Sequence, residues 1–73
     1  MRNPIIKKIT SERAGRIINK RYPLGLFYVL DGGVYVGIDN TTGDAWTEEF
    51  PNLRICKRWL SNPNSIAKEI DYE

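Results

Sequence analysis

Apolar residues at helical spacing predict two helices, one in each half of the chain. Residues 11–21 form the first helix, and Thr10 is its N-cap because a hydroxyl accepts a free first-turn N–H. The second helix follows Pro51, with Asn52 as its N-cap. The two apolar stripes consist of Ala14, Ile17 and Ile18 in the first helix and of Ile55, Cys56, Trp59 and Leu60 in the second.

Between the helices, alternating apolar and polar residues predict three strands joined by two turns. Residues 24–30 and 34–38 flank a glycine pair that is typical of a tight hairpin turn. Residues 40–43 read as a three-residue-loop turn that leads into the third strand. The predicted registers place Val29 opposite Val36, Ile38 opposite Trp46 and Asn40 opposite Asp44.

These registers collect large apolar side chains on one face of the sheet, and we expect both helices to pack there. The predicted fold class is α+β in the order α-β-β-β-α, a three-stranded antiparallel meander with two helices packed on one face. Glu48 also points inward in this register and needs a basic partner or an exposed sheet edge. The apolar side chains of this face are Phe27, Val29, Val36, Ile38, Trp46 and Phe50.

The chain divides into a lead-in over residues 1–9, a single α+β domain over residues 10–62 and a C-terminal tail over residues 63–73. The tail forms either a short helix or no regular structure. With 73 residues, the chain lies near the lower size limit of domains that fold without disulfides or metals.

Cysteine usage and the lack of long apolar stretches indicate the compartment. Cys56 is the single cysteine of the chain, which is typical of small domains in a reducing compartment. No apolar stretch approaches the roughly 18 residues of a membrane helix, and the N-terminus lacks the hydrophobic region of a signal peptide. We therefore expect a cytoplasmic protein without membrane contact.

The residue types disfavour enzyme chemistry. The chain has no histidine, which removes the commonest general base and the commonest metal ligand. Cys56 lies on an apolar helix stripe and is expected to pack in the core. The acidic run over residues 39–44 fits a hairpin turn better than a calcium loop. We expect no catalytic residue, no metal site and no cofactor.

Two surfaces are candidates for binding, because no Lys or Arg lies between Tyr22 and Leu53 whereas both helices are basic. The favoured surface is the helix-free face of the sheet, which suits a protein partner or a second copy unless a terminal segment covers it. It would consist of Leu26, Tyr28, Leu30, Tyr35, Asp39 and Glu49. The alternative is nucleic-acid contact by the helices through Arg13, Arg16, Arg54, Lys57 and Arg58.

The order α-β-β-β-α resembles the topology of double-stranded-RNA-binding domains. Where that family has a glycine-rich loop and a Lys-Lys-x-Ala-Lys sequence, residues 50–57 read Phe-Pro-Asn-Leu-Arg-Ile-Cys-Lys, so the family's function is not transferred. Residues 23–28, residues 34–50 and the Trp59-Leu60 pair together look like small uncharacterised proteins of Gram-positive bacteria and their phages. This resemblance implies an accessory gene of a mobile element. We therefore expect a non-enzymatic binding module that acts through protein contact.

Overall fold

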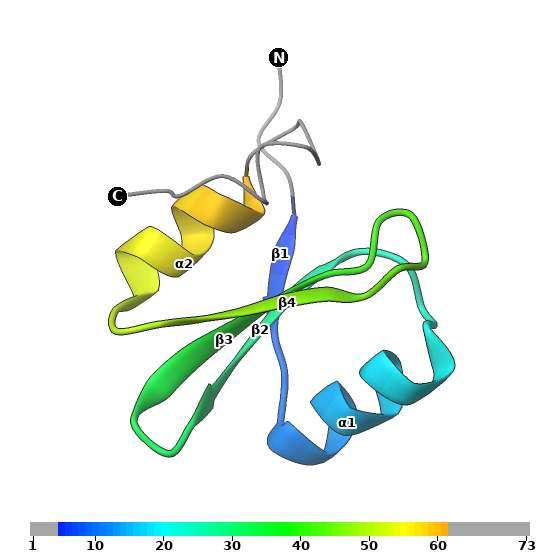
Figure 1. Cartoon of the computed structure of the whole chain (residues 1–73), viewed down its shortest axis with the longest axis horizontal. Helices are drawn as coiled ribbons and strands as arrows, with labels where there is room; N and C mark the ends of the chain where they lie inside the picture. Colours follow the sequence, from blue (N-terminus) through cyan, green and yellow to red (C-terminus); the bar gives the residue numbers. More distant parts are fainter. Residues whose placement is uncertain (1–4, 62–73) are drawn as a thin grey trace.

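The computed structural model describes residues 5–61, which form two helices and a four-stranded sheet (Figure 1). The α+β class is therefore confirmed, and the predicted tail over residues 63–73 lies outside the described residues. The elements are β1 (Ile6–Lys8), α1 (Ser11–Lys20), β2 (Leu26–Asp31), β3 (Val34–Asp39), β4 (Trp46–Phe50) and α2 (Leu53–Leu60).

The strands lie in the order β1-β2-β3-β4, so the predicted antiparallel meander is extended by one strand. β1 comes from the segment predicted as a lead-in, and it pairs parallel to β2 with Ile6 opposite Leu26. The sequence prediction of three strands was incomplete because β1 has only three residues, too few to show an alternating pattern. Ile6 and Ile9 pack against the core, whereas the side chain of Ile5 is exposed.

Both helices begin where the sequence predicts. The Thr10 hydroxyl accepts a hydrogen bond from the Arg13 N–H at 3.2 Å, and the Asn52 side chain accepts one from the Ile55 N–H at 3.0 Å. Each bond satisfies one of the N–H groups that the first turn of a helix leaves without an intrahelical partner. α1 ends at Arg21, whose N–H donates to the Ile17 carbonyl and whose left-handed backbone at φ 60° turns the chain out of the helix.

The helices pack on opposite faces of the sheet, which corrects the expectation that they share one face. Figure 1 shows three layers, with α1 below the sheet and α2 above it. Ala14 and Ile17 of α1 pack against alternate residues of the meander, namely Phe27, Val29 and Ile38. α2 packs on the other face, where its buried residues meet Leu26 and Phe50. The prediction failed because both faces of the sheet are apolar, and only one had been assigned to the core.

The face under α2 is shaped by Gly37, which is buried in the middle of β3. A Cβ atom at this position would meet the ring of Trp59 at 3.1 Å and the sulfur of Cys56 at 3.2 Å. The missing side chain therefore allows α2 to lie close to the strand. Tyr28 pairs with Gly37 on the neighbouring strand, and the ring of Trp59 covers the glycine.

The predicted register is confirmed for β2 and β3 and is wrong for β3 and β4. Val29 lies opposite Val36, as the two-residue turn requires. In the second hairpin, however, Ile38 lies opposite Thr47, and Trp46 lies opposite Asp39. A shift of one residue turns every side chain of β4 to the other face. Trp46, predicted to be buried, is 38% exposed as a result.

The longer loop between β3 and β4 explains the shift in register. Gly43 adopts the left-handed conformation that is typical of the glycine in a three-residue-loop turn, with φ 86°, but Ala45 is also left-handed with φ 51°. This second residue with positive φ lengthens the connection to residues 40–45. Glu48 consequently lies opposite Gly37 rather than Val36, and its side chain is exposed.

Candidate interaction surface

The sheet face predicted as a protein interface is the face that α2 covers. Leu26 is buried there, and Tyr28 and Tyr35 are half-buried against the residues of α2. Leu30, at the end of β2, is 46% exposed. The prediction of a helix-free face was wrong, so these four residues do not form a continuous open surface.

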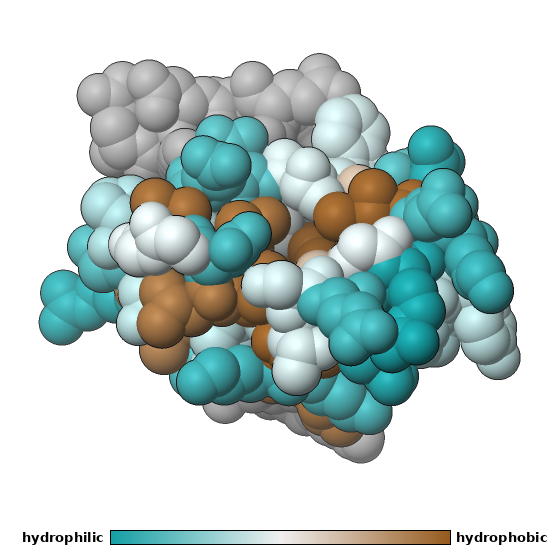
Figure 2. All heavy atoms as spheres, turned by 90° about the horizontal axis from the view of Figure 1, so that it is seen from below, coloured by the Kyte–Doolittle hydropathy of each residue, from teal (hydrophilic) through white to brown (hydrophobic). Residues whose placement is uncertain are grey.

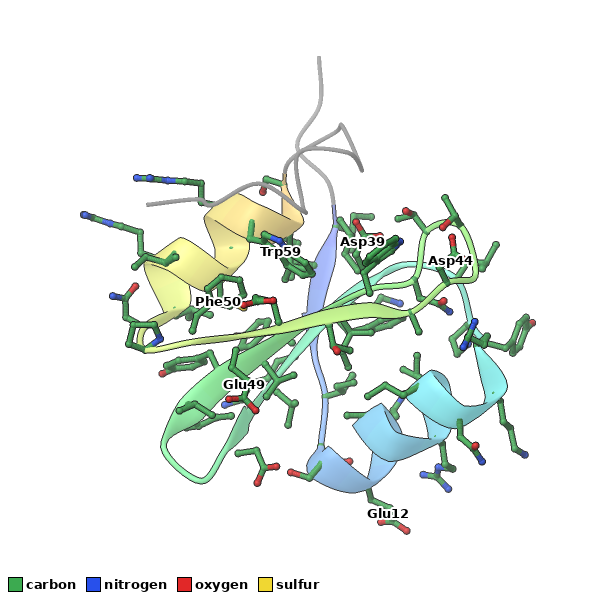
Figure 3. All side chains as sticks on the ribbon, in the orientation of Figure 1. Glu12, Asp39, Asp44, Glu49, Phe50 and Trp59 are labelled. Carbon is green, nitrogen blue, oxygen red and sulfur yellow. The ribbon has the colours of Figure 1, made fainter. Side chains whose placement is uncertain are left out.

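The two acidic residues of the predicted interface have different surroundings. Asp39 is 6% exposed, and its Oδ1 atom accepts hydrogen bonds from the backbone N–H and the hydroxyl of Thr41 at 3.0 and 2.7 Å. Glu49 pairs with Val36 and lies on the α1 side of β4, as Figure 3 shows. The structure therefore places Asp39 in a structural turn and Glu49 on the face opposite Tyr28.

The two tyrosines contact each other and a lysine of α2. Their ring centroids are 6.3 Å apart, and the Lys57 ammonium lies 5.9 Å from the centroid of the Tyr28 ring. That distance is at the outer limit of a cation–π contact. The charge next to the tyrosines is thus positive, whereas the sequence pattern predicted acidic neighbours.

The basic residues proposed for nucleic-acid contact do not form one surface. Arg13 and Arg16 are exposed on α1, below the sheet, whereas Arg54, Lys57 and Arg58 are exposed on α2, above it. The sheet separates the two groups, so one phosphate backbone cannot follow both helices along a single face. Of the residues predicted to contact nucleic acid, α1 contributes two positive charges and α2 contributes three.

Two loops at one end of the sheet are joined through Asn40, a residue that the sequence analysis assigned only to a turn. Its side chain is fully buried; Nδ2 donates to the Pro23 carbonyl at 2.9 Å, and Oδ1 accepts from the Ala45 N–H at 3.0 Å. The backbone of Asn40 also exchanges two hydrogen bonds with Gly25. One residue thus fixes the loop over residues 21–25 against the loop over residues 40–45.

Three large apolar side chains remain exposed on or directly after these joined loops. Tyr22 is 73% exposed, Leu24 is 59% exposed and Trp46 is 38% exposed. We call these three residues the apolar end. A Cβ atom on Gly43 would lie 3.9 Å from a methyl group of Leu24, so the two loops are adjacent there. Figure 3 shows Asp44 on the outer part of the second loop, which adds a negative charge beside this surface.

The surface around α1 is mainly hydrophilic. Seen from below, the right part of the molecule is mostly hydrophilic, and the largest group of hydrophobic side chains lies to the left (Figure 2). Val34 and Val36 belong to the face of the sheet on which α1 packs, and both are half-buried. Neither side chain is as exposed as the residues of the apolar end.

Cys56 is the single cysteine of the chain, and its side chain is completely buried, as its place on the apolar stripe of the second helix predicts. Burial raises the pKa of its thiol from 9.0 to about 11, although the neighbouring Lys57 charge acts in the opposite direction. A thiol with this pKa carries almost no thiolate near neutral pH. The residue therefore contributes to packing under α2.

No metal-binding group and no membrane-spanning helix is found in the part of the chain that the structure describes. Within residues 5–61, His, Cys, Asp and Glu side chains do not gather in threes that would hold an ion. Both described helices are too short to cross a bilayer. Comparison with known proteins found no matching family model, no similar curated protein and no similar solved structure.

Proposed function

We propose that this protein is a non-enzymatic binding module that contacts a partner protein through the apolar end formed by Tyr22, Leu24 and Trp46. One observation carries the proposal: Tyr22 and Leu24 are exposed on a loop that a fully buried asparagine holds in place, and Trp46 is exposed directly after the second loop that this asparagine fixes. Aromatic and aliphatic side chains at the centre of a surface are typical of protein interfaces.

The fixed shape of these loops supports the proposal energetically. A loop that is already ordered loses little conformational entropy when a partner binds, so more of the contact energy appears as affinity. Both hydrogen-bonding groups of the Asn40 side chain are satisfied inside the domain. The Asn40 side chain therefore does not need a hydrogen bond from the partner protein, and the neighbouring apolar side chains form the contact.

The cytoplasmic location and the relation to small proteins of Gram-positive bacteria and their phages belong to the same proposal. The single free cysteine supports a reducing compartment. A gene product of a mobile element that binds a host or phage protein fits a small domain with exposed apolar loops. Nucleic-acid binding is less well supported, because the predicted basic residues lie on opposite sides of the sheet.

The test compares two variants that each remove exposed apolar surface. The first replaces Tyr22 and Leu24 with Ser, and the matched control replaces Leu30 with Ser at the other end of β2, where the side chain is 46% exposed. Self-association is measured by sedimentation velocity. Protein partners are captured from bacterial lysate, and each interaction is then measured with the purified partner.

The proposal predicts that the Tyr22→Ser, Leu24→Ser variant loses a partner, or self-association, that the Leu30→Ser variant retains. Equal binding by both variants would overturn it. Tight binding of an oligonucleotide that depends on Arg54, Lys57 and Arg58 would instead make nucleic acid the ligand.

A further inference from the structure

Part of the α2 face of the sheet carries a positive charge beside an aromatic ring. β1 pairs with β2 in parallel, and Ile6 packs under α2 next to its partner Leu26. Lys8 follows two residues later and therefore lies on the same face, beside its own partner Tyr28. Because neighbouring strands are only about 5 Å apart, the exposed Lys8 side chain begins next to the Tyr28 side chain.

A second lysine reaches the same ring from the helix. The Lys57 ammonium lies over the ring of Tyr28, 5.9 Å from its centroid, and the centroid of the Tyr35 ring lies 6.3 Å from that of Tyr28. Both rings pack against α2 and are half-buried, so each keeps part of its surface accessible. Two lysines from separate elements thus flank a pair of tyrosines. We call Lys8, Tyr28, Tyr35 and Lys57 the lysine–tyrosine patch.

The helix separates the patch from the nearest glutamate on the same face. The row of paired residues across the four strands begins at Lys8 in β1, passes through Gly37 in β3 and ends at Glu48 in β4. Trp59 and Cys56 of α2 stand on Gly37, so the body of the helix lies between Glu48 and the patch. Within residues 5–61, neither lysine of the patch forms an ion pair with a carboxylate.

The other acidic residues of the strands do not face the patch either. Asp39 is buried at the far end of β3, where its carboxylate accepts hydrogen bonds within the loop. Asp31 and Glu49 belong to the opposite face, on which α1 packs. Arg54 and Arg58, both exposed on α2, add positive charge on the same side of the sheet. The patch therefore attracts anionic partners.

We propose that the lysine–tyrosine patch binds a short acidic segment of a partner protein. Two carboxylates of the segment meet Lys8 and Lys57, and an apolar side chain between them lies on the accessible part of the tyrosine rings. Such a contact combines charge pairs, which orient the segment, with burial of apolar surface. The inference rests on the proposed function only in that the partner is a protein, because this surface is separate from the apolar end.

The geometry of the tyrosines favours a protein segment over a nucleic acid. A base stacks on an aromatic side chain through an open ring face. The Lys57 ammonium lies over the ring of Tyr28, and the rings of Tyr28 and Tyr35 are inclined by 51°, so successive bases cannot stack in parallel on the pair. Apolar side chains of a protein segment have no such requirement, because they contact ring edges as well as ring faces.

The experiment uses the full chain and the peptide fluorescein-Gly-Ser-Gly-Glu-Leu-Glu-Phe-Asp-Gly-amide, with affinity measured by fluorescence anisotropy at low and moderate salt. A second peptide has Gln and Asn in place of Glu and Asp and carries the same label. The patch variant is Lys8→Gln with Lys57→Gln. The matched control is Lys7→Gln with Lys20→Gln, which also removes two exposed positive charges but lies on the α1 side of β1 and on α1.

We expect the patch variant to bind the acidic peptide about tenfold more weakly than wild type and the control variant to bind within about twofold. The amide peptide should not bind. Affinity should fall as the salt concentration rises, because the charge pairs are screened. In wild type, the amide chemical shifts measured by NMR should change at Lys8, Tyr28 and Lys57 when the acidic peptide is added.

Equal affinity of the patch and control variants, or equal affinity for the two peptides, would overturn the inference. Tighter binding of a labelled oligothymidylate that is lost in the patch variant would also overturn it, because the ligand would then be a nucleic acid. The chain has acidic residues of its own near the C-terminus, at Glu69, Asp71 and Glu73. If neutralising these three raised the peptide affinity about tenfold, the occupant would be this segment and not a partner.

The proposed function and this inference fail separately. Replacing Tyr22 and Leu24 with Ser should leave the affinity for the acidic peptide unchanged, because neither residue belongs to the lysine–tyrosine patch. Loss of a partner in that variant alone tests the apolar end, and loss of the peptide in the patch variant alone tests the lysine–tyrosine patch.

Discussion

The ring of Trp59 lies on the backbone of Gly37, so close that a Cβ atom on the glycine would be 3.1 Å from Cε3 of the ring. Cys56 Sγ would lie 3.2 Å from the same Cβ, and its residue is fully buried. α2 therefore rests directly on β3 at this point. The contact fixes the distance between the helix and the sheet.

Replacing Gly37 with Ala should lower the free energy of unfolding by about 1–3 kcal/mol, because Trp59 and Cys56 must shift to admit the methyl group. Gly15→Ala is the control, since a Cβ atom there meets nothing within 4 Å and alanine is the better helix former. Urea denaturation of both variants tests this. A Gly37→Ala protein as stable as wild type would show that α2 does not pack this closely.

Asn40→Ala should destabilise the protein by about 2–3 kcal/mol, because the Ala45 N–H and the Pro23 carbonyl both lose their partner. Asn40→Asp keeps the acceptor for Ala45, but it replaces the donor to Pro23 with a buried carboxylate oxygen that faces the Pro23 carbonyl. Its loss of stability at neutral pH should also be measurable. Thermal unfolding followed by circular dichroism gives both values, and an unchanged midpoint for Asn40→Ala would contradict the role assigned to this side chain.

Trp46→Ala should reduce stability by less than about 1 kcal/mol, since the side chain is 38% exposed. Phe50→Ala should cost about 3–5 kcal/mol, because Phe50 is 1% exposed and packs on Trp59 with ring centroids 5.5 Å apart. Chemical denaturation of the two variants compares them directly. A larger loss of stability for Trp46→Ala than for Phe50→Ala would instead support the register predicted from the sequence, in which Trp46 lies opposite Ile38.

Stability should decrease as the pH rises from about 9 toward 11, in part because of Cys56. Burial raises the pKa of this thiol to about 11 in the folded protein from the usual 9.0, so in this range the unfolded chain releases the proton more readily. Cys56→Ala should remove that contribution. The measurement compares unfolding midpoints of the two proteins at pH 8 and pH 10.5, and parallel changes would show that Cys56 does not contribute.

Local signals in the sequence predicted the helices and the first hairpin. Thr10 and Asn52 are N-caps with short-range partners, and the glycine pair at 32 and 33 determines the register of the tight turn. The second hairpin was harder, because the left-handed conformation of Ala45 is not expected for that residue type. One such residue moved Trp46 from the predicted core to the surface.

The candidate surface depended on information that is not local. α2 covers Tyr28 and Tyr35 because it packs on their face of the sheet. Both faces of the sheet are apolar, so the alternation of residues along the strands does not indicate on which face the helix packs. The burial of Asn40 depends on a hydrogen bond to Pro23, which lies 17 residues away in the sequence. The asparagine itself indicated a turn, and nothing nearby in the sequence indicated its second partner.

The parallel pairing of β1 with β2 has a consequence for how the chain folds. Lys7 and Phe27, which are paired, lie about twenty residues apart, whereas Phe27 and Ile38, paired in the next ladder, are separated by about eleven. Closing the longer loop carries the larger entropic penalty, and only three residue pairs compensate for it. We therefore expect the meander of β2, β3 and β4 to assemble first and to provide the template on which β1 docks, and we expect β1 to be the part of the sheet that opens most readily in the native state.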